Sequence, residues 1–83
     1  MADWHWDCDP KDLLDDLEDA VRHEVERLVG EIAVRDSMVY QDGAAYTGTG
    51  PGLQIESRGR LMLTYLTDIR GERIIIIQIT WLS

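Results

Sequence analysis

Apolar residues recur at two different spacings in the first part of the chain, and each spacing predicts a different element. Between residues 3 and 8, tryptophan and cysteine alternate with polar residues, a period of two that is typical of a short strand. From Pro10 to about Arg35, apolar residues follow one another every three or four positions, which places them on one stripe of a helix. That stripe consists of Leu14, Leu17, Val21, Val25, Leu28 and Ile32. Because no glycine or proline marks a break near Glu18, the pattern fits either one helix or a helical hairpin.

The second part of the chain predicts an irregular segment followed by three strands. Residues 36–52 are rich in glycine, which favours turns. After them, apolar and polar residues alternate in three runs, residues 53–57, 61–67 and 73–82. Strict alternation in the last run predicts one face made of Ile75, Ile77, Ile79 and Trp81 and another made of Ile74, Ile76, Gln78, Thr80 and Leu82. Since both faces are largely apolar, we expect a central strand with one face under the helix and the other partly covered.

These elements together predict an α+β fold. A chain of 83 residues has room for one domain, so we expect a single domain over residues 1–83. The predicted order is β-α-(α)-β-β-β, with an antiparallel sheet packed on one long helix or on a helical hairpin.

Net charge narrows the classes of partner. The chain has 16 acidic and 8 basic residues, a formal charge of −8. Residues 1–19 hold eight of the acids and a single base, Lys11. Such a charge argues against a surface that wraps nucleic acid or adheres to an anionic membrane. The lone Cys8 and the lack of a secretory signal or a membrane-length apolar run favour a cytoplasmic protein.

Short motifs along most of the chain resemble the RelE/ParE toxin superfamily. They are Trp4-His5-Trp6-Asp7 at the start, the helical stretch from Leu17 to Ile32, Gly52-Leu53, and the paired stretches Gly59 to Tyr65 and Arg73 to Ile79. The resemblance implies a small domain with an opening strand, a helix or helical hairpin, and a three-strand meander. It also implies the toxin-type component of a toxin–antitoxin pair.

The same resemblance bears on enzymatic activity. The mRNA-cleaving branch of the family uses basic side chains on the open sheet face and a basic or aromatic C-terminal tail, which would stabilise the charged phosphate intermediate and protonate the leaving oxygen. This sequence ends at Trp81-Leu82-Ser83, directly after the last predicted strand. The residues that remain as catalytic candidates are Arg58, Arg60, Arg73 and Tyr65. We therefore expect protein binding, in the manner of an antitoxin segment laid over the sheet and helices, rather than nuclease chemistry.

Candidate partner-binding residues fall into two groups. Asp12, Asp15, Asp16 and Asp19 form an acidic stripe that is either a solvated face or a docking patch for a basic protein. Gln78 and Thr80 belong to a sheet face that also holds His5 and Thr64 in the predicted arrangement. The alternative function is a non-catalytic acidic module that binds a basic regulator or imitates DNA. A homodimer is a further expectation, because the last strand ends in apolar Trp81 and Leu82 and an uncovered sheet edge invites pairing.

No cofactor or metal site is expected. His5, Cys8 and the acids Asp3, Asp7 and Asp9 lie close together in sequence, but they alternate across a predicted strand, and no second His/Cys pair lies near them in the sequence.

Overall fold

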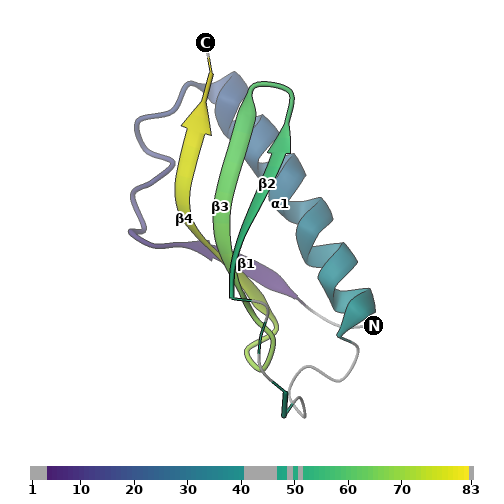
Figure 1. The fold of residues 1–83 in the computed structure, drawn as a ribbon. Helices are drawn as coiled ribbons and strands as arrows, with labels where there is room; N and C mark the ends of the chain where they lie inside the picture. Colours follow the sequence, from purple (N-terminus) through teal and green to yellow (C-terminus); the bar gives the residue numbers. More distant parts are fainter. Residues whose placement is uncertain (1–3, 41–46, 49, 51, 83) are drawn as a thin grey trace.

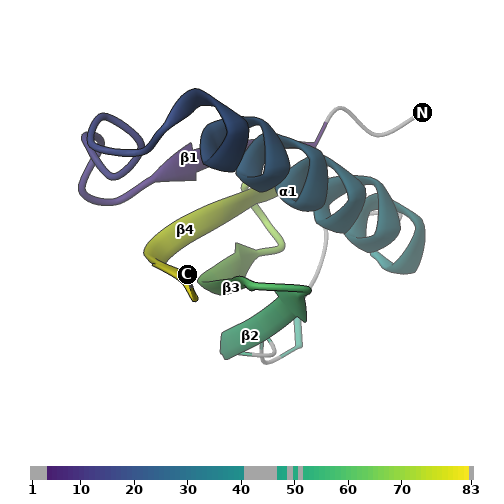
Figure 2. The ribbon, with the colours of Figure 1, turned by 90° about the horizontal axis from the view of Figure 1, so that it is seen from above.

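The computed structural model describes residues 4–40, 47–48, 50 and 52–82. In chain order its elements are β1 (His5–Cys8), α1 (Asp19–Val39), β2 (Leu53–Arg58), β3 (Leu61–Asp68) and β4 (Arg73–Trp81). Figure 1 shows β2, β3 and β4 side by side with α1 behind them and β1 crossing near their lower ends, and Figure 2 shows from above that the helix lies on one face of the sheet. The predicted α+β class is confirmed. Within the described residues, no helix is both long and apolar enough to cross a bilayer.

The sheet is mixed rather than antiparallel. Its strand order is β1-β4-β3-β2, and the pairs β2–β3 and β3–β4 are antiparallel, as the meander predicts. The pair β1–β4 is parallel, so the prediction of a fully antiparallel sheet was wrong at this strand. Alternation of apolar residues reports which face of a strand is buried, but it carries no information on the direction of a strand that pairs far along the chain.

The core lies between α1 and one face of the sheet. From α1, the residues Val25, Leu28, Val29, Ile32 and Ala33 are buried, and they meet Leu61, Leu63, Tyr65, Ile74 and Ile76 of β3 and β4. The predicted stripe is confirmed over the part of α1 that faces the sheet. Full burial of each large aliphatic side chain contributes about 1.5–3 kcal/mol to stability.

The helix begins and ends later than its apolar pattern predicts. It starts at Asp19, while residues 11–17 form turns in which the N–H groups of Leu13 and Asp15 donate to carbonyls three residues earlier. Closely spaced aspartates have low helix propensity and repel one another, which accounts for the late start. The single long helix is therefore confirmed, its predicted start at Pro10 was wrong, and the helical hairpin was wrong. At the other end α1 runs through residues 36–39, which were expected to be irregular, and residues 41–46, 49 and 51 of that segment lie outside the described part.

A β-bulge in β4 changes which side chains share a face. Thr64 pairs with Gln78 while Tyr65 pairs with Ile76, so Ile77 is an extra residue without a partner on β3. The alternation restarts after it. Consequently Ile74, Ile76 and Ile79 pack on the helix side, whereas Ile75, Gln78 and Thr80 face away. Strict alternation along the whole strand was wrong, because it takes no account of this one inserted residue.

Candidate functional site

One face of the sheet is covered by α1, and no described helix or strand lies on the other (Figure 2). The second face carries apolar side chains. The pairing register places five apolar residues on this second face: Leu53, Ile55, Met62, Leu66 and Ile75. Leu53 and Ile55 are 57% and 64% exposed, and Met62 and Leu66 are 36% and 37% exposed. We call these five residues the open face. Exposed apolar side chains grouped on one surface are typical of a site that contacts another molecule.

Polar residues lie among the side chains of the open face. Thr64, Gln78 and Thr80 are on the same side of the sheet as Ile55 and Met62. Two of the predicted partner-binding residues, Gln78 and Thr80, therefore lie next to the open face. Their apolar neighbours were not among the predicted site residues, although the alternation of Leu53 and Ile55 with polar residues already indicated a two-faced strand.

A charged group borders the open face at the start of β4. The Arg73 Nε donates to Asp68 Oδ2 at 2.9 Å, and Arg73 Nη1 lies 3.9 Å from Asp7 Oδ2. The Arg73 guanidinium and a hydrogen bond from the Gly71 N–H hold the pKa of Asp68 below its usual value. The positive charge of Arg73 is therefore already shared with two carboxylates.

The other predicted catalytic arginines lie elsewhere. Arg58 is on the helix side of β2, where its two terminal nitrogens donate to the Glu31 carboxylate of α1 at 2.6 and 2.8 Å. This hydrogen bonding lowers the pKa of Glu31 and raises that of Arg58. Arg60 is exposed in the turn between β2 and β3. Because Arg58 and Arg73 lie on opposite faces of the sheet, the structure does not bring these arginines together as one phosphate-binding group.

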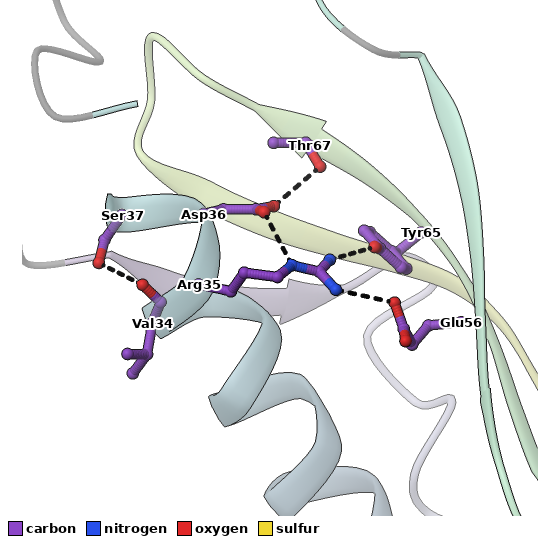
Figure 3. A network of polar contacts seen from close by, with 7 residues as sticks. All are labelled: Val34, Arg35, Asp36, Ser37, Glu56, Tyr65 and Thr67. Atoms are coloured by element: carbon purple, nitrogen blue, oxygen red, sulfur yellow. Dashed lines mark hydrogen bonds and ion pairs between the residues drawn. The ribbon is translucent and has the colours of Figure 1, made fainter. Parts of the chain in front are cut away.

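Tyr65 belongs to a polar network on the helix side (Figure 3). The Arg35 guanidinium donates to the Tyr65 hydroxyl at 3.0 Å, to Glu56 at 3.0 Å and to the buried Asp36 at 3.4 Å. The Thr67 hydroxyl donates to the same Asp36 carboxylate at 3.3 Å. Burial raises the pKa of Tyr65. The phenol is thus a neutral, hydrogen-bonded group that joins β3 to α1, on the opposite face from the open face.

The network encloses a small polar cavity. Its volume is about 110 Å³, and it is lined by Arg35, Asp36, Tyr40, Gln54, Tyr65 and Thr67. Arg35 was not among the predicted site residues. Local sequence patterns could not predict its role, because its partners Glu56 and Tyr65 are 21 and 30 residues away along the chain.

The acidic residues gather in the connection between β1 and α1, which we call the acidic connection (residues 9–18). Asp12, Asp15 and Asp16 are exposed there. Asp19 is the first residue of α1, and its Oδ1 lies 3.9 Å from Arg22 Nη1. Figure 1 shows the acidic connection to the left of β4, and Figure 2 shows it running from β1 to the start of α1. The Arg22 guanidinium donates to the carbonyls of Leu14 and Leu17, which ties the acidic connection to α1. Since residues 11–17 form turns, the carboxylates of Asp12, Asp15 and Asp16 are not spaced along a helix.

His5 and Cys8 lie on opposite faces of β1, so their side chains do not converge on one ion. Burial raises the pKa of the Cys8 thiol, with a smaller contribution from Asp7. In the described part of the chain, no group of three or more histidine, cysteine or acidic side chains is placed to hold a metal ion. Asp3 of the sequence cluster lies outside the described residues.

Comparisons with models of protein families, with curated proteins and with solved structures found no match. The two faces of the sheet and the placement of charge are therefore the observations from which a function is inferred.

Proposed function

We propose that the chain is a RelE/ParE-like, toxin-type component of a toxin–antitoxin pair, and that it acts by binding another protein through the open face. The observation that carries this proposal is a sheet face of five apolar residues, four of them between 36% and 64% exposed, that no described element covers. The assignment to a toxin–antitoxin pair adds the sequence resemblance to that observation.

Burial of the open face supplies the affinity. Leu53 and Ile55 are more than half exposed, and Met62 and Leu66 lie beside them on the neighbouring strand. Covering side chains of this size removes apolar area from water, at about 25 cal/mol per Å². The polar Thr64 and Gln78 among them offer hydrogen bonds that fix the orientation of a bound segment.

The charge of the chain specifies the partner further. The acidic connection exposes Asp12, Asp15 and Asp16, for which no ion pair with a described residue is recorded. A partner that places apolar side chains on the open face and lysine or arginine beside the acidic connection complements both features. We therefore assign an antitoxin-type protein with a segment that is both apolar and basic.

The arrangement of arginines favours protein binding over RNA cleavage. Arg58 is held by Glu31 in a two-point contact, and Arg73 is held by Asp68. Guanidinium groups that already neutralise carboxylates are poor ligands for a phosphate, because the carboxylate must first be displaced. Tyr65 is bound to Arg35 on the helix side.

The test is inducible expression of the full chain in a bacterial host. Growth should stop, cellular RNA should stay intact, and Met62→Asp should restore growth because it places a charge on the open face. Met38→Asp is the matched control, since Met38 is 69% exposed on α1, away from that face. Normal growth with the unaltered chain, cleaved RNA, or equal effects of the two variants would each overturn the proposal.

The second candidate is a non-catalytic acidic module, and the exposure of the carboxylates in the acidic connection favours it. The second candidate binds its partner through the acidic connection, whereas the first binds through the open face. Replacing Asp12, Asp15, Asp16 and Asp19 by asparagine should abolish the growth effect under the second candidate. Under the first, the same replacement only weakens the effect, and Met62→Asp removes it.

A further inference from the structure

Strand β2 forms one edge of the sheet that the described strands build. Among the described strands it pairs only with β3, so its outer side presents backbone groups that can accept another strand. No proline lies in Leu53–Arg58, and its pairing with β3 runs without a register shift. Its exposed apolar side chains, Leu53 and Ile55, face the open side of the sheet.

The charged residues of β2 do not block this edge. Glu56 and Arg58 turn to the helix side, where they are engaged by Arg35 and Glu31 at 3.0 and 2.6 Å. Charges that are already paired within the chain repel an approaching strand less than free charges do.

The opposite edge of the sheet differs from β2. Strand β1 has four residues, exposes His5 and Asp7, and leads directly into Asp9 and Pro10. A short strand with charged side chains and a following proline is the usual way in which an edge avoids pairing. Among the described strands, β1 pairs only with Arg73–Ile76 of β4, so residues 77–81 of β4 extend beyond it, and the expected pairing near Trp81 and Leu82 stays a prediction.

We propose that two copies of the chain associate by antiparallel pairing of β2 with β2 of the partner subunit, centred on Ile55. In a continuous sheet, directly opposite residues must point to the same face. In a symmetric pair of β2 strands, the symmetry axis must therefore pass through a residue and not between two residues. Centring on Glu56 sets two carboxylates against each other at the symmetry axis. Centring on Gln54 or Ser57 pairs only three residues of Leu53–Arg58 from each chain.

The remaining register, centred on Ile55, pairs residues 53–57 of both chains. It sets Ile55 against Ile55 of the partner subunit, Leu53 against Ser57, and Gln54 against Glu56. No like charges are opposed, and the most exposed apolar side chains of the edge become cross-strand neighbours. The two open faces then join into one surface.

This inference is independent of the proposed function, because it concerns the chain alone.

The first test is cross-linking at the symmetry axis. Directly opposed residues of an antiparallel pair have Cα atoms about 4.5–5.5 Å apart, which is within the range of a disulfide. With the native cysteine replaced by Cys8→Ser, Ile55→Cys should form a disulfide-linked dimer under mild oxidation. Met62→Cys in the same background is the control. It lies on the same face but one strand inward, three strand spacings across and four residues along from its counterpart, which is roughly 20 Å at about 4.8 Å per strand and 3.3 Å per residue.

The second test is sedimentation equilibrium of the unaltered chain and of Ile55→Lys, with circular dichroism to establish that both are folded. The unaltered chain should dimerise, and Ile55→Lys should weaken dimerisation at least tenfold, because it sets two positive charges against each other. A chain that stays monomeric at all concentrations overturns the proposal. So does a dimer that is insensitive to Ile55→Lys, or one that cross-links as well through Met62→Cys as through Ile55→Cys.

Discussion

Arg35 joins three elements through its guanidinium group. From α1 it reaches Glu56 of β2 and Tyr65 of β3, and it also lies 3.4 Å from the buried carboxylate of Asp36 (Figure 3). A buried carboxylate that loses its donor incurs a desolvation cost that is not repaid. Arg35 thus fixes the C-terminal half of α1 against the edge of the sheet.

Arg35→Met should therefore lower the free energy of unfolding by about 1–3 kcal/mol, because Asp36 loses a charged donor while the aliphatic volume is kept. Arg27→Met is the control. Within the described part of the chain, the ion pair of Arg27 is with Glu24 on the exposed side of α1, at 3.4 Å, so its loss should cost under about 0.5 kcal/mol. Urea denaturation measures both values. Equal losses for the two variants would contradict the role given to Arg35.

Asp68 makes stability depend on pH. Its pKa in the folded chain is lowered by Arg73 and by the Gly71 N–H. A carboxyl with a lowered folded pKa adds stability above its unfolded pKa of about 3.9, and that stability is lost as the pH falls further. The free energy of unfolding, measured from pH 6 down to pH 2, should decrease below about pH 4. Asp68→Asn should decrease less steeply over the same range, and an identical slope would refute the assignment.

At the scale of elements, local patterns predicted the buried side of each element but not its limits or direction. The stripe that holds Val25 and Ile32 was predicted because a period near 3.6 reports the covered side of a helix directly. The start of α1 at Asp19 was missed, since the apolar spacing continues through turns whose Leu14 and Leu17 still pack against the core. The parallel direction of β1 depends on a contact with β4, about 70 residues away.

For the candidate site too, local patterns predicted part of the residues, and the rest depended on contacts between distant parts of the chain. Gln78 and Thr80 were placed together because residues two apart on a strand share a face. The open face itself needed the register of β2 on β3 and the bulge at Ile77, which are set by tertiary contacts.

The bulge leads to a prediction at this scale. Deleting Ile77 leaves Ile76 opposite Tyr65 and Gln78 opposite Thr64, so each remaining residue of β4 keeps its face. The deletion should cost less stability than Ile76→Ala, a core truncation expected to cost about 2–5 kcal/mol. Thermal and urea unfolding of the two variants give the comparison. A greater loss on deletion would show that Ile77 carries packing that the bulge assignment does not account for.

At the scale of the molecule, the sheet separates two surfaces of different character. On one side α1 covers the core and contributes Glu31 and Arg35 to ion pairs with β2. On the other side, the open face is apolar and lies free of any described element. The acidic connection joins the β1 edge of the sheet to the start of α1 (Figure 2). This asymmetry is the basis for the proposal that the chain acts through the open face and not through a cluster of arginines.

Scanning the whole chain with single aspartate substitutions, under selection for relief of growth arrest, tests this claim most directly. Relief of arrest in variants that stay folded should concentrate at Leu53, Ile55, Met62, Leu66 and Ile75. Exposed apolar residues of α1, such as Val34 and Met38, should tolerate the same charge. Relief that concentrates instead at Arg58, Arg60 and Arg73, with the open face tolerant, would contradict protein binding through that face and favour chemistry at the arginines.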